Sequence, residues 1–217
     1  DLLDIICKDI EEDTEEEDTR IKFAVIGRPN AGKSSIVNAI LNEERNIVTD
    51  IAGTTRDSID SVVKYHNEDI VLIDTAGLRK KTKVSEDVEF YSTIRTYKAI
   101  QRCDVAILVI DVNIIIENLE LASDYKLAAF KLDKQDTTII EEVYKYKKGL
   151  LVVINKWDLI EKDSNTAKLI ENKIREHLRS YDFLKFIFIS AKTKQRIHKI
   201  LEEGKKIYEL RNSEIMT

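Results

Sequence analysis

A glycine-rich segment, Gly27–Ser34, constrains the fold of this chain more than any other feature. It follows an apolar run, Ile21–Ile26, and precedes a helical pattern, Lys33–Leu41. In such a strand–loop–helix unit the backbone N–H groups point at the phosphates of a nucleotide, the lysine reaches the β and γ phosphates, and the serine hydroxyl ligates Mg²⁺. The sequence therefore predicts a bound nucleoside triphosphate. The residues expected to bind it here are Gly27, Arg28, Pro29, Asn30, Ala31, Gly32, Lys33, Ser34 and Ser35.

Short apolar runs alternate with helical patterns along the rest of the chain. The runs expected to be buried strands are Ile21–Ile26, Val71–Ile73, Val105–Ile110, Leu150–Ile154 and Phe186–Ile189. The expected helices are Lys33–Leu41, Asp87–Gln101, Asp136–Lys147, Ser164–Ser180 and Arg196–Leu210. This alternation predicts an α/β fold with a mostly parallel sheet and helices on both faces. Ser58–Tyr65, joined to the next strand by the polar turn His66–Asp69, is expected to be the one antiparallel strand of a six-stranded sheet.

Charge divides the chain into a tail and a globular part. The net charge is −5, but residues 1–20 alone carry −8, and eight of the ten residues Asp9–Asp18 are acidic. Such a composition favours a solvated linker, and the apolar spacing of Asp1–Cys7 is typical of the end of a preceding domain. No apolar stretch approaches the roughly 20 residues that cross a bilayer, so we expect a cytoplasmic protein with no membrane or DNA partner.

Two polar motifs lie where a bound metal and the γ phosphate are expected. Gly53–Asp57 contains a threonine that can complete Mg²⁺ coordination. Asp74–Gly77 follows an apolar strand, which places Asp74 to hold Mg²⁺ through water and the Gly77 N–H to contact the γ phosphate. Both segments are therefore expected to act as switches that sense the γ phosphate.

Two further motifs predict guanine as the base. In Asn155–Asp158 the aspartate can accept hydrogen bonds from guanine N1–H and N2–H₂, a donor pair that adenine lacks. The Ser190–Lys192 segment closes a strand where a backbone N–H can reach guanine O6. The residues expected around the base are Asn155, Lys156, Asp158, Ser190, Ala191 and Lys192.

Together these five motifs resemble those of the Era and MnmE type of GTPase. The stretch Asp74–Lys81, followed by Glu86–Ser92, is similar to the second GTPase domain of the Der (EngA) family. This resemblance implies a Ras-like P-loop fold, a hydrolase that converts GTP to GDP, and a role in assembly of the large ribosomal subunit, with ribosomal particles or rRNA as partners of the full-length protein. It also implies that residues 1–20 end a first GTPase domain and form a linker, that 21–211 form the second, and that 212–217 begin the link to a C-terminal domain. Other domains of the same parent chain are then partners as well.

The resemblance also bears on how GTP would be hydrolysed. Leu78 stands where Ras-like enzymes have a water-orienting glutamine, and its side chain cannot form a hydrogen bond. Catalytic roles are expected for Lys33, Thr55, Gly77 and Glu89, the last matching a water-orienting glutamate of MnmE. The Mg²⁺ ligands implied are Ser34, Thr55 and Asp74. The K⁺ ligands implied are Asn30 with the carbonyl groups of Thr49, Ile51 and Thr54.

The chain departs from the family pattern in two places. Between Asp111 and Gln135 it is about 16 residues longer than the family's usual short loop, which indicates an insertion at about 114–132. Lys194 stands where the family commonly has glycine. Two other functions remain open from sequence: a guanine-nucleotide-dependent scaffold that does not hydrolyse GTP, and a tRNA-modification GTPase.

Overall fold

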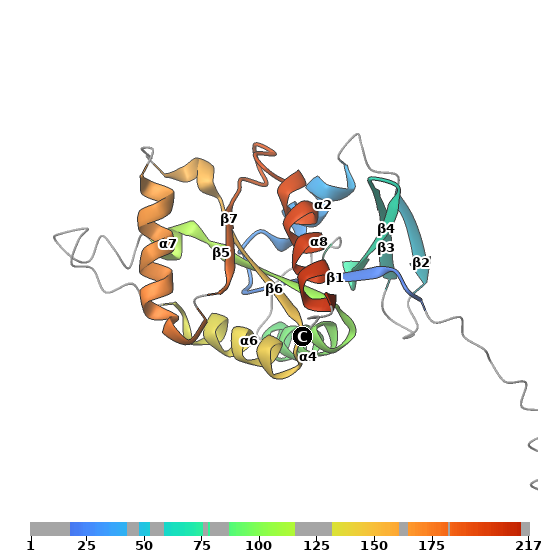
Figure 1. The fold of residues 1–217 in the computed structure, drawn as a ribbon, viewed down its shortest axis with the longest axis horizontal. Coiled ribbons are helices and arrows are strands. Elements are labelled where there is room, and N and C mark those ends of the chain that lie inside the picture. The colour runs from blue at the N-terminus through green and yellow to red at the C-terminus, as the bar shows by residue number, and fades with distance from the viewer. Residues whose placement is uncertain are drawn as a thin grey trace, which may run out of the picture.

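A computed structural model of the chain describes residues 18–42, 48–52, 59–75, 78, 87–115, 132–160, 165–181 and 183–213. A single sheet with the strand order β2-β3-β4-β1-β5-β6-β7 runs through the molecule (Figure 1). The strands are β1 (Ile21–Ile26), β2 (Val48–Ala52), β3 (Ile59–Tyr65), β4 (Glu68–Ile73), β5 (Val105–Asp111), β6 (Gly149–Asn155) and β7 (Lys185–Phe188).

The sheet is mostly parallel, as predicted. β4, β1, β5, β6 and β7 pair in parallel, and β3 pairs antiparallel with both of its neighbours, so it is the one strand of opposite direction. His66 and Asn67 form the turn between β3 and β4 with φ of 47° and 65°, which matches the left-handed geometry of a two-residue hairpin turn. The predicted six strands are present, and the count is corrected to seven because Val48–Ala52 adds an edge strand, β2.

Helices cover both faces of the sheet. They are α2 (Lys33–Leu41), α4 (Asp87–Arg102), α6 (Lys134–Lys145), α7 (Thr166–His177) and α8 (His198–Asn212), with short 3₁₀ turns at Trp157–Leu159 and Arg179–Tyr181. One core cluster packs α4, α6 and α7 against the sheet through residues such as Ile100, Ile140 and Ile174. The other packs α2 and α8 through Ile36, Ile40 and Leu201. Figure 1 shows this three-layer arrangement.

Left-handed backbone explains two helix boundaries that periodicity placed wrongly. The last helix was expected from Arg196, but Arg196 has φ of 59°, and α8 begins at His198. The helix expected over Asp136–Lys147 instead begins at Lys134, because Asp133 caps it by accepting a hydrogen bond from the Gln135 N–H. Its other end falls at Lys145, since Lys147 has φ of 53°. A helix accepts neither conformation in its interior.

The ends of the predicted insertion are packed, although residues 116–131 lie outside the described residues. Ile115 and Leu132 are 1% and 3% exposed and belong to the same core cluster. Among the described helices, none is both long and apolar enough to cross a membrane.

Candidate functional site

The predicted phosphate loop joins β1 to α2 at the carboxyl edge of the sheet. Gly27 and Gly32 have φ of 135° and 96°, and Asn30 between them has φ of 62°. A Cβ added at Gly27 would lie 2.4 Å from the carbonyl oxygen of Val109 in β5, and one at Gly32 would lie 2.2 Å from Nδ2 of Asn155. Contacts this short require glycine at both positions. The tight curl of the loop therefore depends on these two residues.

Lys33 begins α2 and turns back into the loop. Its ammonium group donates hydrogen bonds to the carbonyl oxygens of Gly27 and Arg28, at 2.7 and 2.6 Å. Burial lowers the pKa of Lys33 to about 8, and the nearby carboxylate of Asp136 acts in the opposite direction. A cation with so little water around it interacts strongly with an anion placed at the loop. Ser34 and Ser35, the next two residues of the helix, are exposed.

Asn155, the last residue of β6, connects the phosphate loop to the loop that follows β7. Its Nδ2 donates to the Ala31 carbonyl at 2.9 Å, and its Oδ1 accepts from the Ala191 N–H at 3.1 Å. The side chain is only 2% exposed, so water does not compete strongly for these bonds. One amide thus brings together two predicted motifs that are far apart in sequence.

Asp158 and Ser190 also contact one another. The Ser190 hydroxyl donates to Asp158 Oδ1 at 2.5 Å and accepts from the Thr193 N–H at 3.1 Å. Ser190 and Gln195 exchange two backbone hydrogen bonds, which close the loop that contains Lys192. The carboxylate predicted to contact guanine is therefore oriented by a neighbouring hydroxyl.

Lys194, the departure from the family pattern, has φ of 56°. This is the left-handed region that glycine enters without steric cost. The lysine thus adopts the backbone conformation that suits glycine, at some expense in free energy, and the loop still closes on Ser190.

Asp74 directly follows β4, where the sequence placed it, and its backbone is left-handed with φ of 55°. Its N–H donates to Oδ1 of Asp60 in β3 at 2.8 Å. The pKa of Asp74 is raised chiefly by burial; the positive charge of Arg95 lowers it, while Asp60 raises it. Asp74 is half-buried at the carboxyl end of β4.

Sequence reasoning missed four acidic residues near the predicted motifs. Asp111, 9% exposed at the end of β5, forms an ion pair with Lys156, and Asp133 forms one with Arg28 at 3.2 Å. Asp136 is 1% exposed, and its Oδ1 is a buried side-chain oxygen without a hydrogen-bond partner in the described part of the chain. Asp60 is the fourth, at 7% exposed. The available signal was an acidic residue within or directly after an apolar strand, as at Asp60 and Asp111.

Several predicted site residues fall where nothing is described. Thr54, Thr55 and Gly77 lie outside the described residues, and the side chain of Glu89 in α4 does so as well. Thr49 and Ile51 belong to the edge strand β2, opposite Val62 and Asp60 of β3. Across the described ranges, no group of three or more His, Cys, Asp or Glu residues gathers to hold a metal ion.

A glycine-dependent phosphate loop and two polar loops at the carboxyl edge of a parallel sheet define a P-loop nucleotide-binding domain. Residues 22–156 match the model of a protein family described as 50S ribosome-binding GTPase. The chain belongs to this family of GTPases.

Curated relatives are similar to the whole chain. It is 46% identical over 217 residues to the GTPase Der of Chloroherpeton thalassium and to that of Caldanaerobacter subterraneus, covering 100% of this chain and 46% of each relative. The chain thus spans about half the length of the relatives it matches. The chain is also 45% identical to the GTPase Der of Chlorobium phaeobacteroides, with the same coverage.

Solved structures share the fold. Era bound to MgGDPNP and a segment of 16S ribosomal RNA is 25% identical, with a TM-score of 0.57, covering 86% of this chain and 56% of that one. Aquifex aeolicus Era bound to GDP and AlF4⁻ superposes with the same TM-score at 24% identity, which concerns the fold alone.

Proposed function

We propose that this chain is the second GTPase domain of a longer cytoplasmic protein, a GTP/GDP switch that acts in assembly of the large ribosomal subunit. Three findings support the proposal: the family description, the relatives named GTPase Der, and the Era neighbour solved with ribosomal RNA. Residues 1–20 would then form the end of a first GTPase domain and an acidic linker, and residues 212–217 the start of a connection to a further domain.

The observation that carries the nucleotide site is the pair of hydrogen bonds made by Asn155. They link Ala31 on the phosphate side with Ala191 on the base side. A guanine nucleotide would lie across this link, with its phosphates on the loop Gly27–Ser35 and its base between Asp158 and the segment Ser190–Lys192. Asp158 would accept from guanine N1–H and N2–H₂, and a backbone N–H of Ser190–Lys192 would donate to O6.

Lys33 supplies positive charge at the transferred phosphate. Its ammonium group would leave the carbonyl oxygens of Gly27 and Arg28 and donate to the β and γ phosphates of GTP. The Gly77 N–H would donate to the γ phosphate as well. These donors stabilise charge that develops on the phosphate oxygens as the bond to the leaving GDP breaks.

The residues at this edge of the sheet fit Mg²⁺. Ser34 is exposed at the start of α2, and the half-buried Asp74 ends β4; together with Thr55 they offer the hard oxygen ligands that Mg²⁺ prefers alongside phosphate. When bound, the ion neutralises charge on the β and γ phosphates. Ser34 and Thr55 would ligate it directly, and Asp74 through water.

A second cation and a water-orienting residue complete the proposal. Leu78, half-buried against the core cluster beneath α2 and α8, offers no hydrogen bond to water. K⁺, the second cation, would be held by the exposed Asn30 with carbonyl groups of Thr49, Ile51 and Thr54. Glu89 would orient the attacking water.

Phosphate release from GTP by the 217-residue chain, in matched KCl and NaCl buffers, tests this function. We expect faster turnover in K⁺, loss of the difference in Asn30→Ala, and its retention in the control Asn38→Ala, an exposed asparagine on α2. Equal rates in the two salts would overturn the K⁺ site. Tight GDP binding without turnover in either salt would overturn hydrolysis by this chain alone.

The two alternatives from sequence are not favoured. Relatives named GTPase Der match all of the chain, which argues against a scaffold that does not hydrolyse GTP and against a tRNA-modification GTPase.

A further inference from the structure

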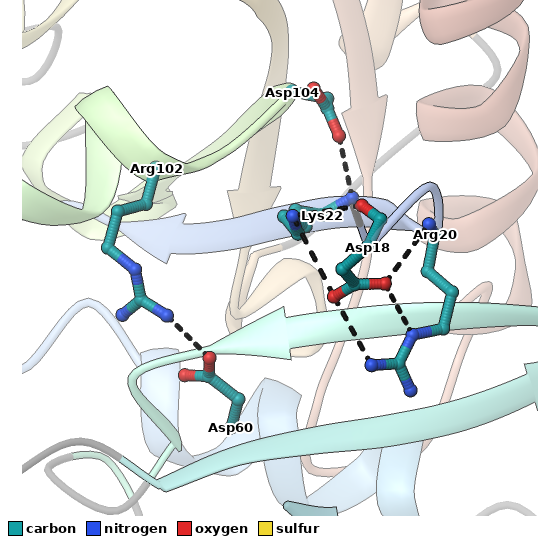
Figure 2. A network of polar contacts seen from close by, with 6 residues as sticks. All are labelled: Asp18, Arg20, Lys22, Asp60, Arg102 and Asp104. Carbon is teal, nitrogen blue, oxygen red and sulfur yellow. Dashed lines mark hydrogen bonds and ion pairs between the residues drawn. The ribbon is translucent and has the colours of Figure 1, made fainter. Parts of the chain in front are cut away.

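Asp60 is a buried carboxylate that uses its two oxygens for two different elements. Oδ1 accepts the backbone N–H of Asp74 at 2.8 Å, and Oδ2 accepts from Nη2 of Arg102 at 2.6 Å. Figure 2 shows the guanidinium of Arg102, the last residue of α4, reaching across to Asp60 in β3. The Asp60 side chain is 10% exposed and that of Arg102 30%. A carboxylate this buried is costly unless its oxygens are hydrogen-bonded, and here both are.

A second cross-strand link lies beside the first. The hydroxyl groups of Ser61 and Thr75 are hydrogen-bonded at 2.8 Å, and both residues are buried. Two successive residues of β3 therefore hold two successive residues at the end of β4. The left-handed backbone of Asp74, φ 55°, is fixed between them. A non-glycine residue keeps this conformation only where its surroundings impose it.

The elements joined by Asp60 flank both predicted switch segments. β3 begins at Ile59, two residues after the end of Gly53–Asp57; Asp74 opens Asp74–Gly77, and α4 begins at Asp87, later in the chain than that second segment. The ion pair thus connects the helix after one switch to the strand after the other, and its carboxylate also accepts the N–H of Asp74, the residue expected to face Mg²⁺.

From this geometry we infer that Asp60 and Arg102 are positioning residues that set the orientation of Asp74 toward Mg²⁺. Arg102 holds the Asp60 carboxylate, Asp60 holds the Asp74 N–H, and the Asp74 side chain is thereby directed to the metal side of the site. The inference rests on the proposed function, since it requires Mg²⁺ at Asp74.

The test measures the Mg²⁺ dependence of GTP turnover and, by calorimetric titration, of GDP binding, for the wild-type 217-residue chain and for Arg102→Gln. Loss of a charge-assisted hydrogen bond is expected to raise the Mg²⁺ concentration for half-maximal turnover roughly 3- to 10-fold. At saturating Mg²⁺ the KM for GTP should stay unchanged, because the phosphate loop is intact. In Arg102→Lys the Mg²⁺ concentration for half-maximal turnover should rise less than in Arg102→Gln, since lysine keeps the charge and one donor.

Arg20→Gln is the matched control. Arg20 pairs with Asp18 at 2.7 Å, but both side chains are about one-third exposed, and the pair lies at the start of β1 (Figure 2). Its loss should leave the Mg²⁺ dependence unchanged. A change in Arg20→Gln equal to that in Arg102→Gln would overturn the inference.

Asp60→Asn keeps the test decisive if Arg102→Gln folds poorly. The carboxamide oxygen can still accept the Asp74 N–H, but the amide no longer attracts the guanidinium, so half-saturation should again rise. Variants that melt earlier yet keep the wild-type Mg²⁺ half-saturation would show a purely structural ion pair and overturn the inference. If turnover by the wild-type chain did not depend on Mg²⁺, the proposed metal site would be wrong, and the inference with it. If only the variants kept the wild-type Mg²⁺ half-saturation, the inference alone would be wrong.

Discussion

The phosphate side and the base side of the nucleotide site differ in what they are made of. On the phosphate side, Gly27 and Gly32 leave no room for a Cβ, and the Lys33 ammonium is held by backbone carbonyl groups. On the base side, the contacts are made by side chains: Ser190 to Asp158, and Asn155 to Ala191.

This difference separates affinity from selectivity. Backbone N–H groups and the Lys33 ammonium recognise phosphate, which all nucleoside triphosphates share, so changes there should affect every nucleotide alike. The Asp158 carboxylate, with a backbone N–H of Ser190–Lys192, reads the edge of the base, so changes there should alter the choice among bases while the phosphate contacts remain. Four substitutions test this division.

Gly32→Ala should have the largest effect. Its Cβ would lie 2.2 Å from Asn155 Nδ2 at a φ of 96°, which is expected to cost about 3 kcal/mol of stability through overlap and backbone strain. Calorimetric titration should then detect no binding of GDP or of tripolyphosphate. Gly204→Ala is the control: its Cβ would press on the Phe23 ring at 2.8 Å and on no residue of the five motifs, so it should lower stability and spare GDP binding. Normal GDP affinity in Gly32→Ala would contradict a backbone-built phosphate side.

Asp158→Asn should weaken GDP binding about 30-fold, about 2 kcal/mol, because a carboxylate that accepts two guanine donors is replaced by an amide with one acceptor. Binding of tripolyphosphate, which has no base, should not change. Titration with both ligands measures the separation directly. If both affinities fell together, the two sides would not be independent.

Asp136→Asn should stabilise the nucleotide-free protein in a pH-dependent way. Burial, the largest cause, raises the pKa of Asp136 to about 6 from 3.8, with Arg28 and Lys33 opposing it. The folded state therefore favours the protonated acid: its contribution to stability is present below pH 3.8 and is lost as the pH rises through about 6. Replacement should add about 2–3 kcal/mol at pH 8 and well under about 1 kcal/mol at pH 4.

Urea unfolding at several pH values measures this effect. Glu141→Gln, an exposed carboxylate on the same helix, is the control and should show no such trend. If Asp136→Asn stabilised the protein equally at pH 4 and pH 8, the stabilisation would not come from removing the buried carboxylate charge.

Lys194→Gly should have the smallest effect. Glycine adopts the observed φ of 56° freely, so the base-side loop should gain about 0.5 kcal/mol. Thermal unfolding compared with Lys192→Gly, whose backbone is not left-handed, isolates the effect, because that second change should only destabilise. GDP affinity of Lys194→Gly should remain that of the wild type.

How well the sequence predicted the structure depended on whether the signal was local. β1 and α2 were predicted with the observed bounds because Gly27 and Gly32 mark the ends of a local pattern. The edge strand β2 was missed because it is short and is defined by its pairing with β3, which no local pattern reveals. The start of α8 was misplaced by two residues because hydrophobic periodicity does not reveal the left-handed backbone of Arg196.

The candidate site divides in the same way. Motifs such as Asn155–Asp158 were found from spacing and from the apolar strand before them. The partners of these motifs were not: Asp60 reaches Asp74 from another strand, and Asp136 approaches Lys33 from another helix. Long-range packing sets such contacts, so a single sequence contains no spacing rule for them.

The internal hydrogen bonds of Lys33 have a consequence for the heat of nucleotide binding. The ammonium group already has two backbone acceptors within the loop, so a phosphate oxygen would replace existing bonds and add few new ones. The measured enthalpy would then be a difference between two sets of similar bonds. Much of the affinity would come from the closer approach of opposite charges within a partly dehydrated loop.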